Sequence, residues 1–75
     1  MAEIKLGDKV RNVATDSQGW QTIQEGDVIA LVDEFAVVKV THCRLQHREH
    51  PERGRDLPAR GEVAFLKGEC DAVGG

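Results

Sequence analysis

Apolar and polar residues alternate over short stretches along much of the chain, which is the two-residue period of a β-strand. The clearest case is a pair of runs, 28–32 and 35–40, which are rich in branched residues and flank an Asp-Glu pair. Side chains branched at Cβ favour strands, because a helix restricts their rotamers. This pattern predicts a β-hairpin with its turn at Asp33 and Glu34.

Weaker patterns predict strands on both sides of this hairpin. Residues 4–6 read as a short strand that turns at Gly7-Asp8 into a second extended piece, and 61–69 hold the last strand. Between them, the stretch 14–27 is rich in Asp, Ser, Gln and Gly, so we expect a loop there.

Two further segments are expected to be irregular. Residues 44–60 contain both prolines, which are disfavoured in central strands, and form an inserted basic loop before the last strand. Residues 70–75 form a flexible tail. The pattern as a whole predicts an all-β fold, a small barrel of four to five short antiparallel strands that leaves few exposed edges.

A chain of 75 residues is expected to form a single domain, 1–75, with a thin apolar core. The apolar positions of the predicted strands give the expected core residues: Ile4, Leu6, Val10, Ile23, Val28, Ala30, Val32, Phe35, Val38, Val40, Val63 and Phe65.

Charge is unevenly distributed along the chain. The window 39–60 holds six basic and three acidic residues, so a chain with a net charge of −3 carries +3 there and −6 elsewhere. Such asymmetry indicates a basic segment that faces a partner, although a solvated loop has the same composition.

The first ten residues lack an apolar signal core, and no segment approaches transmembrane length. We therefore expect a cytoplasmic protein, not associated with a membrane, in which Cys43 and Cys70 stay reduced.

One cluster suggests a metal site. Cys43, His47 and His50 have the spacing C-x3-H-x2-H, with Cys70 far downstream. Structural zinc usually takes two close pairs of ligands, whereas this chain has no C-x2-C pair. The simpler interpretation is a packed Cys43 beside solvated histidines, so we predict no metal and no cofactor, with zinc as the open alternative.

Several stretches together resemble the SH3-like barrels of the KOW type. They are Leu6–Arg11 with its Gly-Asp-x-Val pattern, Gly19, the Gly-x-Val strand at 26–32, and the valine-rich 36–40. Gly26 before the valine run would let two backbones approach closely at a bend. The resemblance implies an SH3-like fold and binding to RNA, DNA or a protein partner. The long stretch 13–25 and the insertion 44–60 depart from the family pattern.

Catalysis is not predicted. The one serine, Ser17, lies in an expected loop, and the glycines are spaced for turns rather than for holding phosphate. The type II dihydrofolate reductases are SH3-like chains that share the Gly7–Arg11 start and a following tryptophan. They depend on a Val-Gln-Ile-Tyr run that this chain lacks. No small-molecule substrate is evident.

The sequence therefore predicts a non-catalytic binding module or adaptor. The leading hypothesis is docking to a protein partner, or to a second copy, through a barrel face and the loop 44–60. The alternative is nucleic-acid binding, RNA or DNA, through phosphate contacts from the arginines. For Trp20, a buried position over the core and an exposed binding position both remain open. The candidate binding residues are Trp20, Lys39, Arg44, Arg48, Arg53, Arg55 and Arg60.

Overall fold

A computed structural model describes residues 3–73 as an antiparallel sheet of six strands, with no α-helix in that range. The elements in chain order are β1 (Lys9–Thr15), β2 (Trp20–Val32), β3 (Phe35–His47), the 3-10 helix η1 (Pro51–Arg53), β4 (Arg55–Leu57), β5 (Glu62–Leu66), the 3-10 helix η2 (Lys67–Glu69) and β6 (Cys70–Ala72). The strand order is β4-β3-β2-β1-β6, and β5 also pairs with β3. The expectation of an all-β fold is confirmed.

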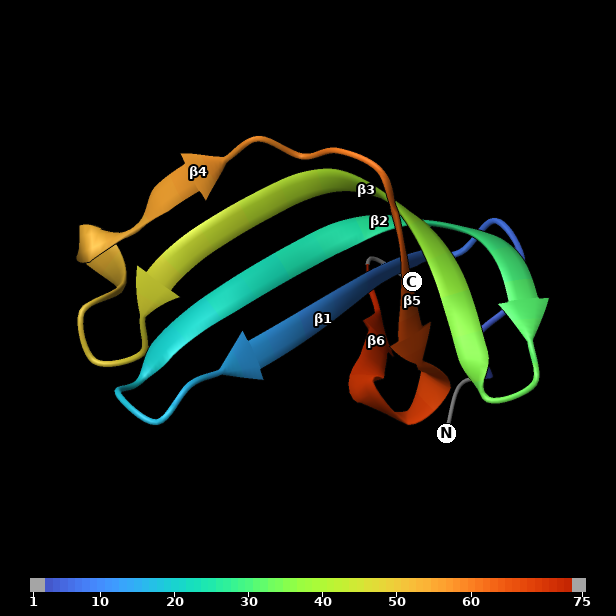
Figure 1. Cartoon of the computed structure of the whole chain (residues 1–75), viewed down its shortest axis with the longest axis horizontal. Coiled ribbons are helices and arrows are strands. Elements are labelled where there is room, and N and C mark those ends of the chain that lie inside the picture. The colour runs from blue at the N-terminus through green and yellow to red at the C-terminus, as the bar shows by residue number, and fades with distance from the viewer. Residues whose placement is uncertain (1–2, 74–75) are drawn as a thin grey trace.

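The long strands β2 and β3 run the length of the molecule and arch together (Figure 1). One half of the arch curls over β5 and β6, and we call it the core half: residues 4–12, 26–40 and 61–73. The other half carries the β1–β2 turn, η1 and β4, and we call it the arm: residues 13–25 and 41–57. In Figure 1 the arm lies at the left and the core half at the right.

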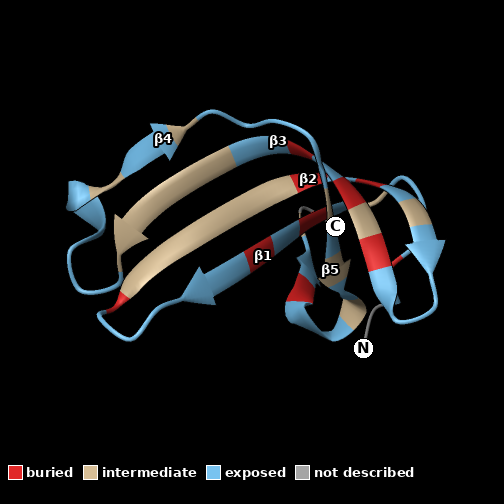
Figure 2. Cartoon of the chain, viewed as in Figure 1, coloured by how far each residue is buried: buried red, intermediate tan, exposed pale blue. Residues whose placement is uncertain are grey.

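Apolar burial is concentrated in the core half. The buried cluster consists of Ile4, Val10, Val28, Ala36, Val38 and Cys70, with Phe65 packed against it. Figure 2 shows the same division, because the strands of the arm are drawn as half-buried or exposed. The arm is therefore a single layer of sheet without a core of its own.

The two halves meet at Gly26, where β2 and β3 approach closely. The register of the β2–β3 ladder shifts between Glu25 and Gly26. A Cβ at position 26 would overlap the backbone carbonyl of Lys39 and lie 2.8 Å from Cγ1 of Val38. Only glycine leaves room for this crossing, and the sequence pattern predicts such a bend before the valine run.

A buried polar side chain of β1 holds β6 in place as the edge strand next to β1. The Nδ2 of Asn12 donates a hydrogen bond to the backbone oxygen of Glu69 at 3.1 Å, and Asn12 lies opposite Cys70 in the β1–β6 ladder. The expectation of a flexible tail at 70–75 is thus wrong for 70–72, because a buried cysteine holds them against β1. Residues 74 and 75 lie outside the described part of the chain.

Three other local expectations are wrong. The stretch 14–27 is not a loop, since most of it is the β1–β2 hairpin, whose exposed strands lack apolar alternation. The segment 44–60 is only partly a loop, because β3 continues to His47 and β4 pairs with it. Residues 4–6 form no strand and instead lead into a turn in which the Lys5 amide donates to Asp8 Oδ2 at 2.9 Å.

The expectation for the core is confirmed for five of the twelve residues and wrong for three that are exposed. Ile4, Val10, Val28, Val38 and Val40 are buried. Leu6, Val32 and Phe35 are exposed instead. The remaining four expected positions are half-buried, namely Ile23, Ala30, Val63 and Phe65.

No helix within residues 3–73 is long and apolar enough to cross a membrane.

We predict that Gly26→Ala lowers the free energy of unfolding by about 3 kcal/mol, because a methyl group must displace the backbone of β3. Urea denaturation followed by circular dichroism measures the change. Gly68→Ala is the matched control, since a Cβ there meets nothing within 4 Å, and it should shift the unfolding free energy by less than about 0.5 kcal/mol. Equal stabilities of the two variants would contradict the close crossing.

Candidate functional site

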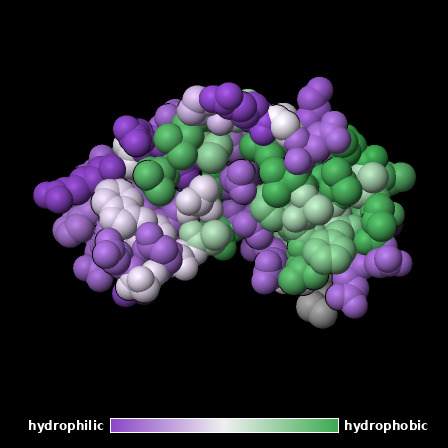
Figure 3. Space-filling view, in the orientation of Figure 1, coloured by the Kyte–Doolittle hydropathy of each residue, from purple (hydrophilic) through white to green (hydrophobic). Residues whose placement is uncertain are grey.

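Exposed apolar side chains gather at the far end of the core half. Five large hydrophobic residues of the β2–β3 hairpin and β5 are exposed, and we call this group the apolar tip: Ile29, Leu31, Val32, Phe35 and Leu66. Val32 retains 54% of its accessible surface and Phe35 43%. Figure 3 shows a broad hydrophobic surface over this half of the molecule. Exposed apolar side chains gathered at one end of a molecule are characteristic of interaction sites.

Strand register explains why the tip is apolar on the side that faces away from the core. Val32, Phe35 and Leu66 lie opposite one another across β2, β3 and β5, and thus form one cross-strand row. Because residues directly opposite in a ladder share a face, their side chains emerge together. A second register shift, between Val28 and Ala30, leaves Ile29 as an additional exposed residue.

The turn that closes the apolar tip is acidic. Asp33 adopts a left-handed backbone conformation with φ of 51°, which completes the tight turn without glycine. The backbone oxygen of Glu34 accepts a hydrogen bond from the amide of Lys67 at 2.8 Å, so the turn is fixed to η2. Both carboxylates are exposed, and neither forms an ion pair with another described residue.

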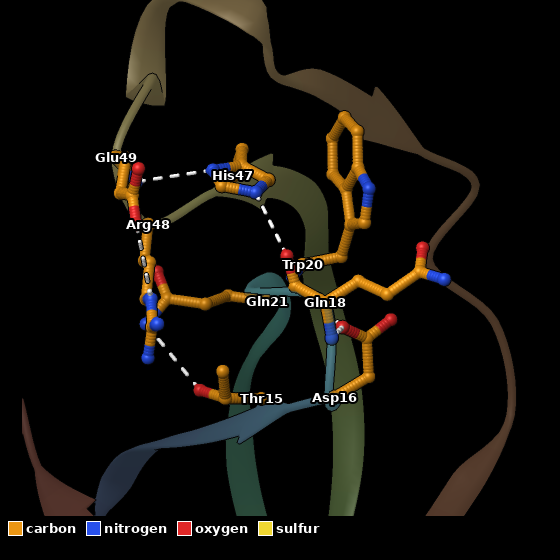
Figure 4. A network of polar contacts seen from close by, with 8 residues as sticks. All are labelled: Thr15, Asp16, Gln18, Trp20, Gln21, His47, Arg48 and Glu49. Atoms are coloured by element: carbon orange, nitrogen blue, oxygen red, sulfur yellow. Dashed lines mark hydrogen bonds and ion pairs between the residues drawn. The ribbon is translucent and has the colours of Figure 1, made fainter.

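At the opposite end, Trp20 and His47 hold the arm together (Figure 4). Their rings meet edge to face with centroids 5.1 Å apart. The amide of Glu49 donates to His47 Nδ1 at 3.2 Å, so Nε2 carries the proton and donates to the Gln18 oxygen at 2.9 Å. This contact ties the end of β3 to the β1–β2 turn.

That turn is also locally determined. Asp16 Oδ1 accepts hydrogen bonds from the amides of Gln18 and Trp20, at 2.8 and 2.9 Å. Gly19 completes the turn with φ of 89°. The Trp20 ring is thereby placed on the arm, half-buried, rather than over the core. Trp20 is therefore neither buried over the core nor fully exposed, which were the two positions that the sequence left open.

One face of the arm is continuous with the core side of the sheet, and we call it the inner face. It begins beside Asn12, a buried residue of β1 in the core half, with the arm residues in register with it. Between β2 and β3, the pairs on this face are Trp20 with His47, Thr22 with Leu45 and Gln24 with Cys43. Between β3 and β4, they are Cys43 with Leu57 and Leu45 with Arg55. Figure 3 shows the molecular surface hollowed between the arm and the core half on this concave side.

Three of the seven candidate binding residues have acidic neighbours. Lys39 lies between Asp27 and Glu62 in the ladder. Arg44 contacts Asp56 at 3.3 Å and donates to Gln46 Oε1 at 3.1 Å.

Arg48 lies 3.9 Å from Glu49 at the tip of the arm, and both side chains are mostly exposed. An ion pair so exposed contributes little to stability, but it lowers the local positive charge.

The other three arginines are free within the described residues. Arg53 in η1, Arg55 in β4 and Arg60 in the connection to β5 are exposed, and none forms an ion pair there. The structure thus separates the arginines of the predicted basic loop into two groups. Arg44 in β3 and Arg48 just beyond it have acidic partners, whereas the arginines along η1, β4 and the connection are free within the described residues.

The opposite face of the arm has a shallow depression of about 490 Å³. Its walls include two ion pairs, Arg11 with Glu25 at 3.2 Å and Arg44 with Asp56 at 3.3 Å. Since these arginines are already matched by carboxylates, the depression offers no net positive charge to a phosphate.

The two cysteines lie in one cross-strand row, Cys43–Gln24–Asn12–Cys70. Three strand spacings of roughly 4.8 Å place them about 14 Å apart along the sheet, too far for a disulfide or a shared zinc ion. No group of three metal-ligating side chains occurs within residues 3–73. Burial raises the pKa of the Cys70 thiol, and repulsion from Asp71 and then Glu69 raises it further.

Comparison with protein families, curated proteins and solved structures found no match for this chain.

The sequence pattern does not predict the apolar tip, because it places Val32 and Phe35 in the core. A signal for it does exist in the sequence. The run Ile29-Ala30-Leu31-Val32 is apolar at every position, so the face of the strand that is turned away from the core is also apolar.

We predict that iodoacetamide at pH 8 alkylates Cys43 much faster than Cys70, by about tenfold or more. Cys43 is half-buried, whereas Cys70 keeps only 8% of its accessible surface and its raised pKa favours the unreactive thiol. Peptide mass spectrometry over time measures both rates. Equal rates in the folded protein, or a Cys43–Cys70 disulfide formed under mild oxidation, would contradict the positions of the two residues.

Proposed function

We propose that this protein is a non-catalytic binding module that docks to protein through the apolar tip. The observation that carries the proposal is the cluster of five exposed large hydrophobic side chains at one end of the molecule. A monomeric protein rarely leaves so many large apolar side chains exposed at one end without a use, because such exposure promotes association. Its acidic rim, Asp33 and Glu34, favours a partner with basic residues around an apolar groove.

We further propose that the core half is an SH3-like barrel of the KOW type. Support comes from the strand order β6-β1-β2-β3-β5, which wraps five strands around one small apolar cluster. The sharp bend at Gly26 also fits, since small barrels close through bends at glycine. The arm is then an extension of β1, β2 and β3 beyond the part that surrounds the apolar cluster.

The free thiols of Cys43 and Cys70 fit the reducing cytoplasm, which we propose as the compartment.

Nucleic-acid binding is the weaker candidate. Free arginines are needed to neutralise phosphates, and Lys39, Arg44 and Arg48 have acidic neighbours. Stacking would require exposed aromatic rings beside the arginines, whereas Trp20 is half-buried against His47.

Site-specific photo-crosslinking in cells tests the docking surface. We expect a benzophenone amino acid in place of Phe35 to give protein–protein crosslinks. The matched control is the same substitution at Val13, which is equally exposed at 43% but lies on the arm. Equal crosslinking at both positions, or crosslinks to nucleic acid alone, would contradict the proposal.

A further inference from the structure

We infer that the partner at the apolar tip is a second copy of this chain, which receives the tip in the hollow beneath its arm. This inference rests on the proposed function and specifies its partner. The two copies are related head to tail, so the tip of one meets the inner face of the arm of the next.

Charge complementarity supports this arrangement. The tip presents Asp33 and Glu34, which are exposed and have no ion-pair partner within the described residues. The arm presents Arg53 and Arg55, which are likewise free there. The edge of the arm formed by η1 and β4 therefore carries two unpaired arginines, and the tip carries two unpaired carboxylates, which favours contact between that edge and the tip. Asp16, in the β1–β2 turn of the arm, instead accepts two backbone amide hydrogen bonds.

The apolar surfaces are also complementary in kind. The tip offers Phe35 and Val32 on a narrow hairpin. The inner face offers Trp20, Leu45 and Leu57, all of them half-buried and none covered by a second layer. Arg55 lies opposite Leu45 in the ladder, so basic and apolar groups adjoin on the arm as acidic and apolar groups adjoin on the tip.

The exposed area of the molecule is large enough for such a contact. The chain exposes 5317 Å², whereas a compact monomer of 8.3 kDa exposes about 4,600 Å². The molecule is thus more extended than a compact monomer, and its surface has room for the roughly 800 Å² that each partner buries in a standard interface. The radius of gyration, 12.5 Å, likewise exceeds the roughly 11 Å expected for a compact chain of this length.

A head-to-tail contact leaves one free tip and one free arm in every dimer. Such a heterologous contact continues into longer chains unless the rotation between copies closes a ring. We therefore expect a series of oligomers that grows with concentration, rather than a single dimer.

Sedimentation velocity on complementary variants tests this inference. Phe35→Asp removes the tip, and Arg55→Glu reverses a charge on the arm; both residues are exposed, so the fold is retained. Each variant alone should self-associate about tenfold more weakly than the natural sequence or not at all. Mixed in equal amounts, they should form a one-to-one dimer and nothing larger, because the remaining tip docks on the remaining arm.

Gln18→Ala is the control variant, since Gln18 is exposed on the arm but outside the inner face, and its side chain forms no hydrogen bond within the described residues. It should oligomerise like the natural sequence. Oligomers should also weaken as salt rises from 50 to 300 mM, because the charges at the contact are exposed.

Two results would overturn the inference. In the first, the natural sequence stays monomeric at millimolar concentration, which excludes a second copy as the partner. The crosslinks from position 35 to another protein would still support the proposed function. In the second, a dimer is abolished by Phe35→Asp, kept by Arg55→Glu and not restored by mixing, which indicates tip-to-tip pairing.

Discussion

The close crossing of β2 and β3 at Gly26 is the contact on which the rest of the structure depends. These two strands supply the longest ladder of the sheet, and at Gly26 the register shifts and the backbones lie too near for any side chain. The bend directs the valine-rich halves of both strands over β5 and β6, where they bury a core. It also sends their polar halves outward as an arm. One glycine thus divides a continuous pair of strands into two regions of different chemistry.

The two halves are held together by different forces. The core half depends on apolar burial around Val10 and Val38 and on the hydrogen bond from Asn12 to Glu69. The arm has little to bury, so it depends on ladder hydrogen bonds, on the Asp16 turn and on the contact between Trp20 and His47. We expect the arm to open at lower free energy than the core half, because regions with few buried apolar contacts unfold locally first. A sheet of one layer is also an available surface for a second molecule.

The sequence predicted those features that depend on local pattern. The Asp33-Glu34 hairpin, the strand at 62–66 and the role of Gly26 were all expected, because branched residues and glycine act through the backbone nearby. The exposure of Phe35 and Val32 was not expected, since burial depends on whether a second layer covers the face. The strands of the arm were mistaken for loops, because their composition is polar when both faces meet water. Cys70 was placed in a flexible tail, although pairing with β1 buries it, and such a long-range contact leaves no local signal.

The candidate site shows the same limit. The arginines were identified from composition alone, but composition could not show that Arg44 contacts Asp56 while Arg53 and Arg55 stay free. The tip and the inner face of the arm belong to opposite ends of the same two strands, so only the folded structure shows that the free carboxylates of the tip and the free Arg53 and Arg55 lie at opposite ends.

Amide-resolved NMR spectra recorded over a range of protein concentrations test the central claim most directly, which is that one molecule carries two unlike and mutually complementary ends. As concentration rises, we predict that amides at 29–35 and at 20–22, 43–47 and 53–57 shift together along one binding curve. The amides of the buried core, such as Val10 and Val38, should stay in place. Spectra that do not change with concentration, or shifts confined to the tip, would contradict it.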